Sequence, residues 1–219
     1  PLFVEISLYG ISAKTHEAIT AVPGSFERTM VAIRFLQTHK LNIHIKSPVM
    51  TLNIHELEAI RTFARDIGAM FRPDPVIFPK LDSSDIPLNY RINEEELGRY
   101  FREISPEWRT RPLPLDKTVC GAGKGIMAIS PYGDVYPCLR IQNNAGNVRT
   151  SAVTEIWTNS PIMKEIRELT LTNLKRCAIC DDIQYCSPCP GIALLEHGDI
   201  TQPANECCRQ ARTRRKNFI

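Results

Sequence analysis

Apolar and polar positions in the first third of the chain alternate between strand-like and helix-like patterns. Residues 2–8 are largely apolar and precede Gly10, which predicts a short buried strand. Residues 42–50 alternate as a second strand does. Residues 69–78 read as a third strand, and the two prolines within it indicate an edge or irregular strand. We therefore expect three strands in this part of the chain.

Helical patterns separate the three expected strands. Residues 11–22 are expected to form a loop, and the helix after it has Ser25 as its expected N-cap and apolar residues at helical spacing, namely Phe26, Met30, Ile33 and Leu36. Asn53 is the expected N-cap of a second helix, which is expected to end at Gly68. Strands that alternate with helices over short connections predict parallel pairing through right-handed crossovers. Three parallel strands do not close a barrel, so the expected α/β fold is half of a larger one.

The alternation of strand and helix patterns ends after the third expected strand. Residues 79–92 are rich in Pro, Asp and Ser, and residues 93–104 predict a short helix. Residues 105–117 contain three prolines and are the expected linker. The predicted domains are therefore residues 1–104 and 118–219.

Composition excludes several classes of protein. Of the 219 residues, 43% are apolar and 23% are charged, which is typical of a folded globular chain rather than a disordered one. No apolar run approaches the roughly 18 residues that a membrane helix needs, and the N-terminus lacks the pattern of a secretion signal. We expect a cytoplasmic protein without a membrane partner.

The net charge of +3 arises from the second part of the chain. Five basic residues lie within residues 209–216, and no acidic residue lies among them. This cluster predicts a solvated helix end. Nucleic acid is not an expected partner, because no interleaved aromatic residues or groove-reading motif accompany the basic residues.

All eight cysteines lie in the second part of the chain, at positions 120, 138, 177, 180, 186, 189, 207 and 208. Residues 126–130 and 134–138 flank a turn sequence and predict a β-hairpin that ends near Cys138. Disulfides are disfavoured, because half of the chain is thiol-free and of α/β type. A zinc site with four thiolate ligands is a competing hypothesis, although the two Cys-x2-Cys pairs are closer together than in most zinc ribbons. Closely spaced thiolates are typical of iron–sulfur clusters, which the pattern favours.

The spacing Cys-x12-Gly-x4-Cys, then Cys-x2-Cys-x5-Cys-x2-Cys, then Cys after 17 residues, resembles the seven-cysteine SPASM domain. That domain carries auxiliary iron–sulfur clusters in radical S-adenosylmethionine (radical SAM) enzymes that modify peptides. Residues 4–30 separately resemble the fourth strand and following helix of the radical SAM partial barrel. The resemblance implies half of a partial (β/α) barrel, followed by a small cysteine-rich domain with a β-hairpin and short helices.

The resemblance also implies the metal ligands and cofactors. Two auxiliary [4Fe–4S] clusters are expected: an inner one nearer the active site, with ligands Cys120, Cys138 and Cys189, and an outer one, with ligands Cys177, Cys180, Cys186 and Cys207. Cys208 is the alternative outer ligand. The residues after Cys120 contain no further cysteine before Cys138, so one iron of the inner cluster is expected to be open or held by a substrate group. The usual pattern has three residues before the fourth cysteine of the run, where this chain has two.

The barrel half is expected to contribute to binding of S-adenosylmethionine. Ser7 matches the polar position on the fourth strand near the ribose, and Lys46 and Ser47 lie where further contacts occur in the family. The five histidines show no ligand spacing and are expected to be structural. The motif Cys-x3-Cys-x2-Cys, which holds the cluster that cleaves S-adenosylmethionine, does not occur in the sequence. We therefore expect the C-terminal part of a longer enzyme, inactive as this chain alone and with unknown catalytic residues.

The implied activity is modification of a ribosomally made precursor peptide or protein. In the family a 5′-deoxyadenosyl radical abstracts a hydrogen atom from the substrate, and the auxiliary clusters transfer electrons or bind the substrate. A low-potential electron donor such as flavodoxin or ferredoxin is the second expected partner. Leu139 stands where sulfatase-modifying members have an acidic base, which disfavours that chemistry. The alternative is a non-catalytic interaction module that binds iron–sulfur or zinc.

Overall fold

The computed structural model describes residues 3–106 and 113–218, which form two compact units. Unit 1 comprises Pro1–Ile77 and Pro87–Tyr100, and unit 2 comprises Phe78–Ile86 and Phe101–Ile219. Most of the expected linker, residues 107–112, lies outside the described residues. No helix in the part of the chain that the structure describes is both long enough and apolar enough to cross a membrane.

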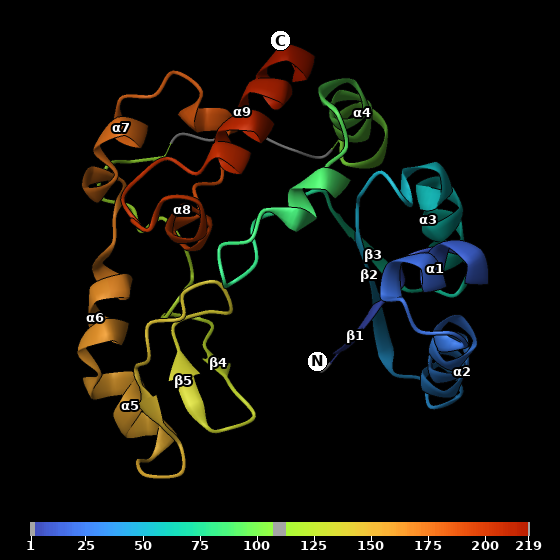
Figure 1. Cartoon of the computed structure of the whole chain (residues 1–219), viewed down its shortest axis with the longest axis horizontal. Helices are drawn as coiled ribbons and strands as arrows, with labels where there is room; N and C mark the ends of the chain where they lie inside the picture. The colour runs from blue at the N-terminus through green and yellow to red at the C-terminus, as the bar shows by residue number, and fades with distance from the viewer. Residues whose placement is uncertain (1–2, 107–112, 219) are drawn as a thin grey trace. The chain divides into compact units, whose positions relative to one another are not determined.

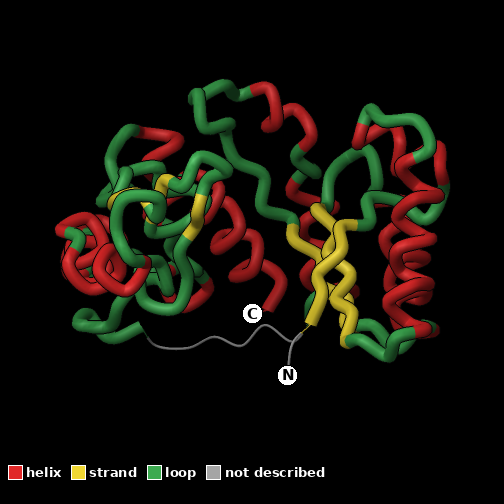
Figure 2. Tube along the Cα trace, turned by 90° about the horizontal axis from the view of Figure 1, so that it is seen from below, coloured by secondary structure: helices red, strands yellow, loops and turns green. Residues whose placement is uncertain are grey.

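Unit 1 is built on a parallel sheet of three strands in the order β1-β2-β3 (Figures 1 and 2). The strands span Phe3–Ser7 (β1), Asn42–Pro48 (β2) and Met70–Asp74 (β3). The predicted α/β class and parallel pairing are confirmed. Pro73 is tolerated in β3 because this strand pairs only with β2 among the described strands, so its missing N–H interrupts no inner ladder.

Three α-helices cover one side of this sheet (Figure 1): α1 (Ala13–Thr20), α2 (Ser25–Thr38) and α3 (Leu57–Asp66), with a 3-10 turn, η1 (Ile54–Glu56), before α3. The expected loop at 11–22 was wrong, because the Ser12 side chain accepts from the Thr15 N–H and caps a short helix. Gly24, rather than Ser25, is the N-cap of α2, with the left-handed φ of 73° that glycine tolerates.

The two faces of the sheet differ in polarity. Ile6, Leu8, Ile43 and Ile45 pack with the helices in an apolar core. The opposite face is largely polar, although Phe3 and Met70 also lie on it, and it carries an ion pair between Lys46 and Glu5. Strand alternation and register place further polar side chains on that face, namely Ser7, His44, Arg72 and Asp74. The sheet thus has one apolar face covered by helices and one largely polar face.

The remaining elements of unit 1 follow β3. They are the 3-10 helix η2 (Ile86–Tyr90), whose first residue lies in unit 2, and α4 (Glu94–Arg99). Helix α4 continues into a π turn, η3 (Tyr100–Ile104), of which only Tyr100 belongs to unit 1. Asn93 and Glu96 form a reciprocal capping box at the start of α4, which explains why a helix begins there.

Unit 2 contains a small antiparallel sheet and short helices. The predicted hairpin is present as β4 (Ala128–Ile129) and β5 (Asp134–Tyr136), and β6 (Gly146–Asn147) pairs with β5. The helices, which Figure 1 shows in part, are α5 (Val153–Asn159), α6 (Pro161–Glu168), η4 (Leu171–Asn173), α7 (Lys175–Ala178), η5 (Ile183–Tyr185), α8 (Pro190–His197) and α9 (Asn205–Phe218).

The basic cluster at 209–216 lies on α9 and is only partly solvated. The Arg214 guanidinium is buried, lies 4.5 Å from the centre of the Phe101 ring and donates to the Tyr185 carbonyl at 3.1 Å. Arg209 pairs with Glu206, which is fully buried. The expectation of a simple solvated helix end was therefore wrong, because Arg214 is buried against its own unit and Arg215 pairs with Asp182 at 2.9 Å.

Candidate metal centres

Four cysteine side chains line one cavity of unit 2. The cavity has a volume of about 210 Å³, and its walls include Cys177, Cys180, Cys186 and Cys208. Burial first, and neighbouring thiols second, raise the pKa of Cys177 and of Cys186. Burial also raises the pKa of Cys208, although the Arg212 charge opposes it. For Cys186 the pKa rises to about 12. The mutual effect of these thiols shows that they lie close together around the cavity, and a metal cofactor bound there would require them as thiolates.

Three short elements bring these four thiols together. Cys177 lies on α7, and Cys180 follows in a turn in which its N–H donates to the Cys177 carbonyl at 3.1 Å. Cys186 ends η5. Cys208 lies on α9, so residues separated by about 30 positions in the chain meet at this cavity.

The structure favours Cys208 over Cys207 for this outer set. Cys207 is not among the residues that line the cavity. Its carbonyl accepts from the Cys186 thiol at 3.8 Å, whereas its own sulfur receives the backbone N–H of Cys189. The expected assignment of Cys207 to the outer cluster does not match this placement, because the two neighbouring side chains leave α9 in different directions.

A second set of thiols lies in the same unit. Besides burial, the neighbouring Cys189 and Cys138 thiols help to raise the pKa of Cys120, so the three expected inner residues lie near one another. Burial is the first cause of the raised pKa of Cys120. Cys120 and Cys138 pack against a core of Ala122, Ile141 and Ile166, so this set lies beside the interior of the unit.

Arg140 spans the inner set and was not singled out from the sequence. Its backbone N–H donates to the Cys138 sulfur at 3.3 Å, and its guanidinium lies 3.8 Å from the Cys189 sulfur. The guanidinium also lies 4.5 Å from the centre of the Phe78 ring, which fixes its direction. Arg140 thus contacts two of the three expected inner sulfurs, one through its backbone and one through its side chain.

Close backbone packing holds the inner set in place. The Gly123 N–H donates to the Pro137 carbonyl at 3.1 Å, which ties the loop after Cys120 to the residue before Cys138. Gly191, in the first turn of α8, leaves so little space that an added Cβ would lie 2.6 Å from the Arg140 Cβ. Cys189 is the N-cap of α8, so the packing of this helix sets the position of its sulfur.

The arrangement suits a multi-atom cluster better than a single ion. Within residues 3–106 and 113–218, no group of three or more His, Cys, Asp or Glu side chains is placed to hold a metal ion. A tetrahedral zinc site needs its sulfurs about 2.3 Å from one metal atom. The four outer thiols instead surround a cavity of about 210 Å³, which leaves room for the iron and sulfide of a cluster.

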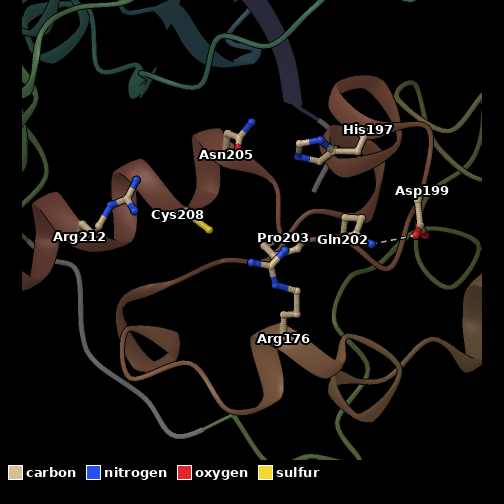
Figure 3. A pocket seen from close by; sticks show the side chains of 8 residues that line it. All are labelled: Arg176, His197, Asp199, Gln202, Pro203, Asn205, Cys208 and Arg212. Carbon is tan, nitrogen blue, oxygen red and sulfur yellow. Dashed lines mark hydrogen bonds between the residues drawn. The ribbon is translucent and has the colours of Figure 1, made fainter.

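A larger, more polar cavity of about 530 Å³ adjoins the outer set and shares Cys208 with it. Figure 3 shows Arg176 of α7 and Arg212 of α9 lining this cavity, with His197 and Asp199 on its other side. The Asp199 carboxylate already accepts from Thr201 and Gln202. Arg176 and Arg212 have no ion-pair partner among the residues that the structure describes, so the cavity beside the outer thiols carries positive charge.

The two expected cofactor residues are neighbours in unit 1. Ser7 and Lys46 are register partners in β1 and β2, and both lie on the polar face of the sheet. Ser47 lies on the other face, is fully buried and has no hydrogen-bond partner for its hydroxyl. Ser47 therefore does not share a face of the sheet with Ser7 and Lys46. His16 is buried, where it accepts from the Tyr9 N–H at 3.3 Å, which fits its expected structural role.

Comparison with known proteins identifies the cysteine-rich region. Residues 120–190 match the family described as SPASM, an iron–sulfur cluster-binding domain. This segment is a SPASM domain. The predicted resemblance to radical SAM enzymes with a SPASM domain is thereby confirmed, and the match covers six of the eight cysteines.

Relatives extend the likeness over both units. The AdoMet-dependent heme synthase of Methanosarcina barkeri is 24% identical over 93% of this chain and 66% of its own length. The subtilosin biosynthesis protein AlbA of Bacillus subtilis is 23% identical over 88% of this chain and 45% of its own length. Streptococcus suis SuiB, crystallised with S-adenosylmethionine, shares the fold with a TM-score of 0.61 and 13% identity, over 93% of this chain and 52% of SuiB.

The chain thus spans between about half and two thirds of the length of the relatives described above. The match to SuiB includes the parallel sheet as well as the SPASM domain, because it covers nearly the whole chain. The predicted fold, half of a partial barrel followed by a cysteine-rich domain, is confirmed.

Proposed function

We propose that this chain is part of a radical SAM enzyme in which the SPASM domain holds two auxiliary [4Fe–4S] clusters. The observation that carries this proposal is the convergence of Cys177, Cys180, Cys186 and Cys208 on one cavity, in a domain whose family binds iron–sulfur clusters. The inner cluster is assigned to Cys120, Cys138 and Cys189. Such clusters supply electron transfer or substrate binding when they are bound.

The polar face of the unit 1 sheet is the proposed binding side for S-adenosylmethionine. Ser7 and Lys46 lie side by side there, where a hydroxyl and an ammonium group can bind the ribose and carboxylate of the cofactor. Glu5 competes for Lys46 through an ion pair of 3.7 Å, so cofactor binding has to exchange or share that contact. The cluster that cleaves the cofactor is proposed to belong to another segment of a longer polypeptide, and the chain alone is proposed to be inactive.

The proposed substrate is a ribosomally made peptide or protein, from which the 5′-deoxyadenosyl radical abstracts hydrogen. The similarity to a protein of bacteriocin biosynthesis supports this class of substrate. A porphyrin is the second candidate substrate, because a heme synthase is the relative matched over 93% of the chain. Incubation of the whole protein with S-adenosylmethionine and each substrate class separates the two candidates by the product mass.

The protein is proposed to act in the cytoplasm. Its proposed redox partner is a low-potential electron donor such as flavodoxin or ferredoxin. Arg176 and Arg212 support the partner assignment, because unpaired positive charge beside the outer thiols attracts an acidic protein surface. Charge reversal at both arginines is expected to slow reduction of the clusters by flavodoxin and to leave reduction by dithionite unchanged.

Metal analysis tests the central proposal. Anaerobically prepared protein is expected to be brown and to contain about eight irons per chain with matching sulfide, as two four-iron clusters require. Colourless protein with stoichiometric zinc would instead support a zinc-binding interaction module. Protein that holds clusters but cleaves no S-adenosylmethionine as the whole polypeptide would support a non-catalytic iron–sulfur module.

A further inference from the structure

The SPASM domain of this chain has one thiol more than the seven-cysteine pattern requires. With Cys208 placed at the outer cavity, the thiol left over is Cys207. The inner set, by contrast, has three thiols for a cluster of four irons. The residues between Cys120 and Cys138 contain no further cysteine. The surplus thiol and the missing ligand therefore belong to the same domain.

Helix geometry separates the two adjacent cysteines. Successive side chains on an α-helix leave the axis about 100° apart. Cys207 and Cys208 both lie on α9, and Cys208 lines the outer cavity. The same helix orientation that brings Cys208 to the outer thiols thus turns Cys207 away from the cavity.

The contacts of Cys207 show where its side chain lies. Its sulfur is largely buried and receives the backbone N–H of Cys189, an expected inner ligand. Its carbonyl accepts from the outer thiol of Cys186 at 3.8 Å. The thiols that act on the Cys207 sulfur are those of Cys186 first and Cys189 second. The Cys207 sulfur therefore lies between one outer thiol and Cys189, the expected inner residue whose N–H it receives.

The bond to the Cys207 sulfur is of the kind found at the inner set. Cys120 receives the backbone N–H of Ala122, and Cys138 receives that of Arg140 at 3.3 Å. Backbone N–H donors stabilise a thiolate and are typical of thiolates that bind iron–sulfur clusters. A buried thiol with such a donor next to Cys189 is equipped to bind metal as a thiolate.

We propose that Cys207 is the fourth protein ligand of the inner cluster. The chain would then hold two complete four-cysteine sites: Cys120, Cys138, Cys189 and Cys207 in the inner one, and Cys177, Cys180, Cys186 and Cys208 in the outer one. This assignment rests on the proposed function and deepens it, because an inner cluster with four thiolates has no iron open to substrate. It would transfer electrons rather than bind the substrate.

The test uses a background that contains only the inner cluster. Cys177→Ala is expected to remove the outer cluster and leave about four irons per chain. In that background, Cys207→Ala and, separately, Cys207→Ser are compared with Cys208→Ala. Iron content and electron paramagnetic resonance are measured before and after mild oxidation. An iron without a thiolate is the one that oxidation releases, and its loss leaves a three-iron cluster with its own resonance signal.

The proposal predicts that both Cys207 variants lose about one iron per chain on oxidation and show the three-iron signal, whereas Cys208→Ala behaves as the background does. It is overturned if the Cys207 variants match the background, or if Cys208→Ala alone shows the signal. A Cys177→Ala background that retains about eight irons would overturn the division into two sites, and with it this assignment. Unsubstituted protein that binds no iron would overturn the proposed function itself, which is a different and separately visible result.

Discussion

At the residue scale, one buried carboxylate organises the carboxyl end of β1. Glu56 accepts the backbone N–H groups of Ile11 and Ser12 at 2.6 and 3.2 Å, and the hydroxyls of Ser12 and Thr15 at 2.7 and 2.6 Å. Gly10 allows this approach, because an added Cβ would lie 2.9 Å from the Glu56 carboxylate. The loop after β1 and the start of α3 are thereby joined through one side chain.

Substitution Glu56→Gln is expected to lower the free energy of unfolding of unit 1 by about 1–3 kcal/mol, the range for hydrogen bonds to a charged group. An amide presents one oxygen and one NH₂ group to donors that need two acceptor oxygens. Hydrogen exchange of the β1–β3 amides measures the change. Glu58→Gln is the matched control, since Glu58 is exposed and pairs only with Arg61 in the described structure. Equal effects of both variants would contradict the prediction.

The pH dependence of unit 1 follows from the same carboxylate. Burial raises the pKa of Glu56, but hydrogen bonds from Thr15, Ser12 and Ile11 outweigh burial and hold the pKa below the ordinary glutamate value. Its contribution to stability is therefore complete above the unfolded-state pKa of about 4.3 and is lost as the pH falls through the lower folded-state pKa. Denaturation at a series of acidic pH values should show this loss in the parent chain and not in Glu56→Gln.

At the element scale, α8 positions the inner thiols through its first turn. Gly191 is buried and faces the segment of Arg140 and Ile141, with space for no side chain. The helix N-cap is Cys189, so displacement of α8 moves a proposed ligand directly. The close packing of Gly191 therefore fixes the segment after Cys138 relative to Cys189 at the start of α8.

Gly191→Ala is expected to lower unit 2 stability by about 1–3 kcal/mol through overpacking. It is also expected to reduce the iron content by about four per chain, because only the inner cluster is disturbed. Iron and sulfide analysis with anaerobic denaturation measures both effects. Gly125→Ala is the control, because nothing lies within 4 Å of the added Cβ at that glycine. Full iron content in Gly191→Ala would show that the segment of Arg140 and Ile141 can move aside without disturbing the inner cluster.

Neighbouring strands position the proposed cofactor residues. Ser7→Ala and Lys46→Ala, made in the whole polypeptide, are each expected to weaken binding of S-adenosylmethionine by about 10-fold, as loss of one or two hydrogen bonds would. Calorimetric titration measures the affinity. Lys40→Ala, in the exposed connection before β2, is the control for loss of a positive charge. Unchanged affinity in both strand variants would remove these residues from the cofactor site.

At the scale of the whole molecule, the two units obtain their stability in different ways. Unit 1 has a core between helices and sheet that includes Leu8, Ile33, Ile45 and Ile60. Unit 2 has only short strands among its described residues, and its buried clusters around Ile141 and around Val135 are small. Its proposed clusters would therefore supply much of its folding free energy, as thiolate-bound metals do in other small domains.

Anaerobic removal of iron by a chelator is expected to unfold unit 2 and to leave unit 1 folded. Hydrogen exchange should show protection lost in α8 and α9 and retained in β1–β3. Replacement of the chelator by its iron-loaded form is the control. Loss of protection in both units at one chelator concentration would show that unit 1 depends on the clusters as well.

Much of this organisation follows from local sequence patterns. Strand runs, helical spacing and turn residues predicted the three parallel strands, α2, α3 and the hairpin, because each depends on near neighbours in the chain. Helix α1 was not predicted, because its few apolar residues give a weak helical pattern and its start depends on the Ser12 side chain. Asn53 was expected to cap a helix, but its side chain binds the backbone of Tyr9, Pro48 and Met50 instead. Such contacts cross between segments, so the local pattern does not contain them.

For the metal centres, the sequence by itself determined the class of ligand and the division of the thiols into closely spaced groups, because spacing limits which sulfurs can meet. Only the tertiary structure decided between Cys207 and Cys208. That choice depends on the rotation of α9 about its axis, which is set by packing such as that of Arg214 on Phe101. The same holds for Arg140, whose contact with Cys189 joins positions 49 residues apart. The spacing of cysteines along the chain defines which sulfurs can act as ligands, and packing decides the direction in which each side chain points.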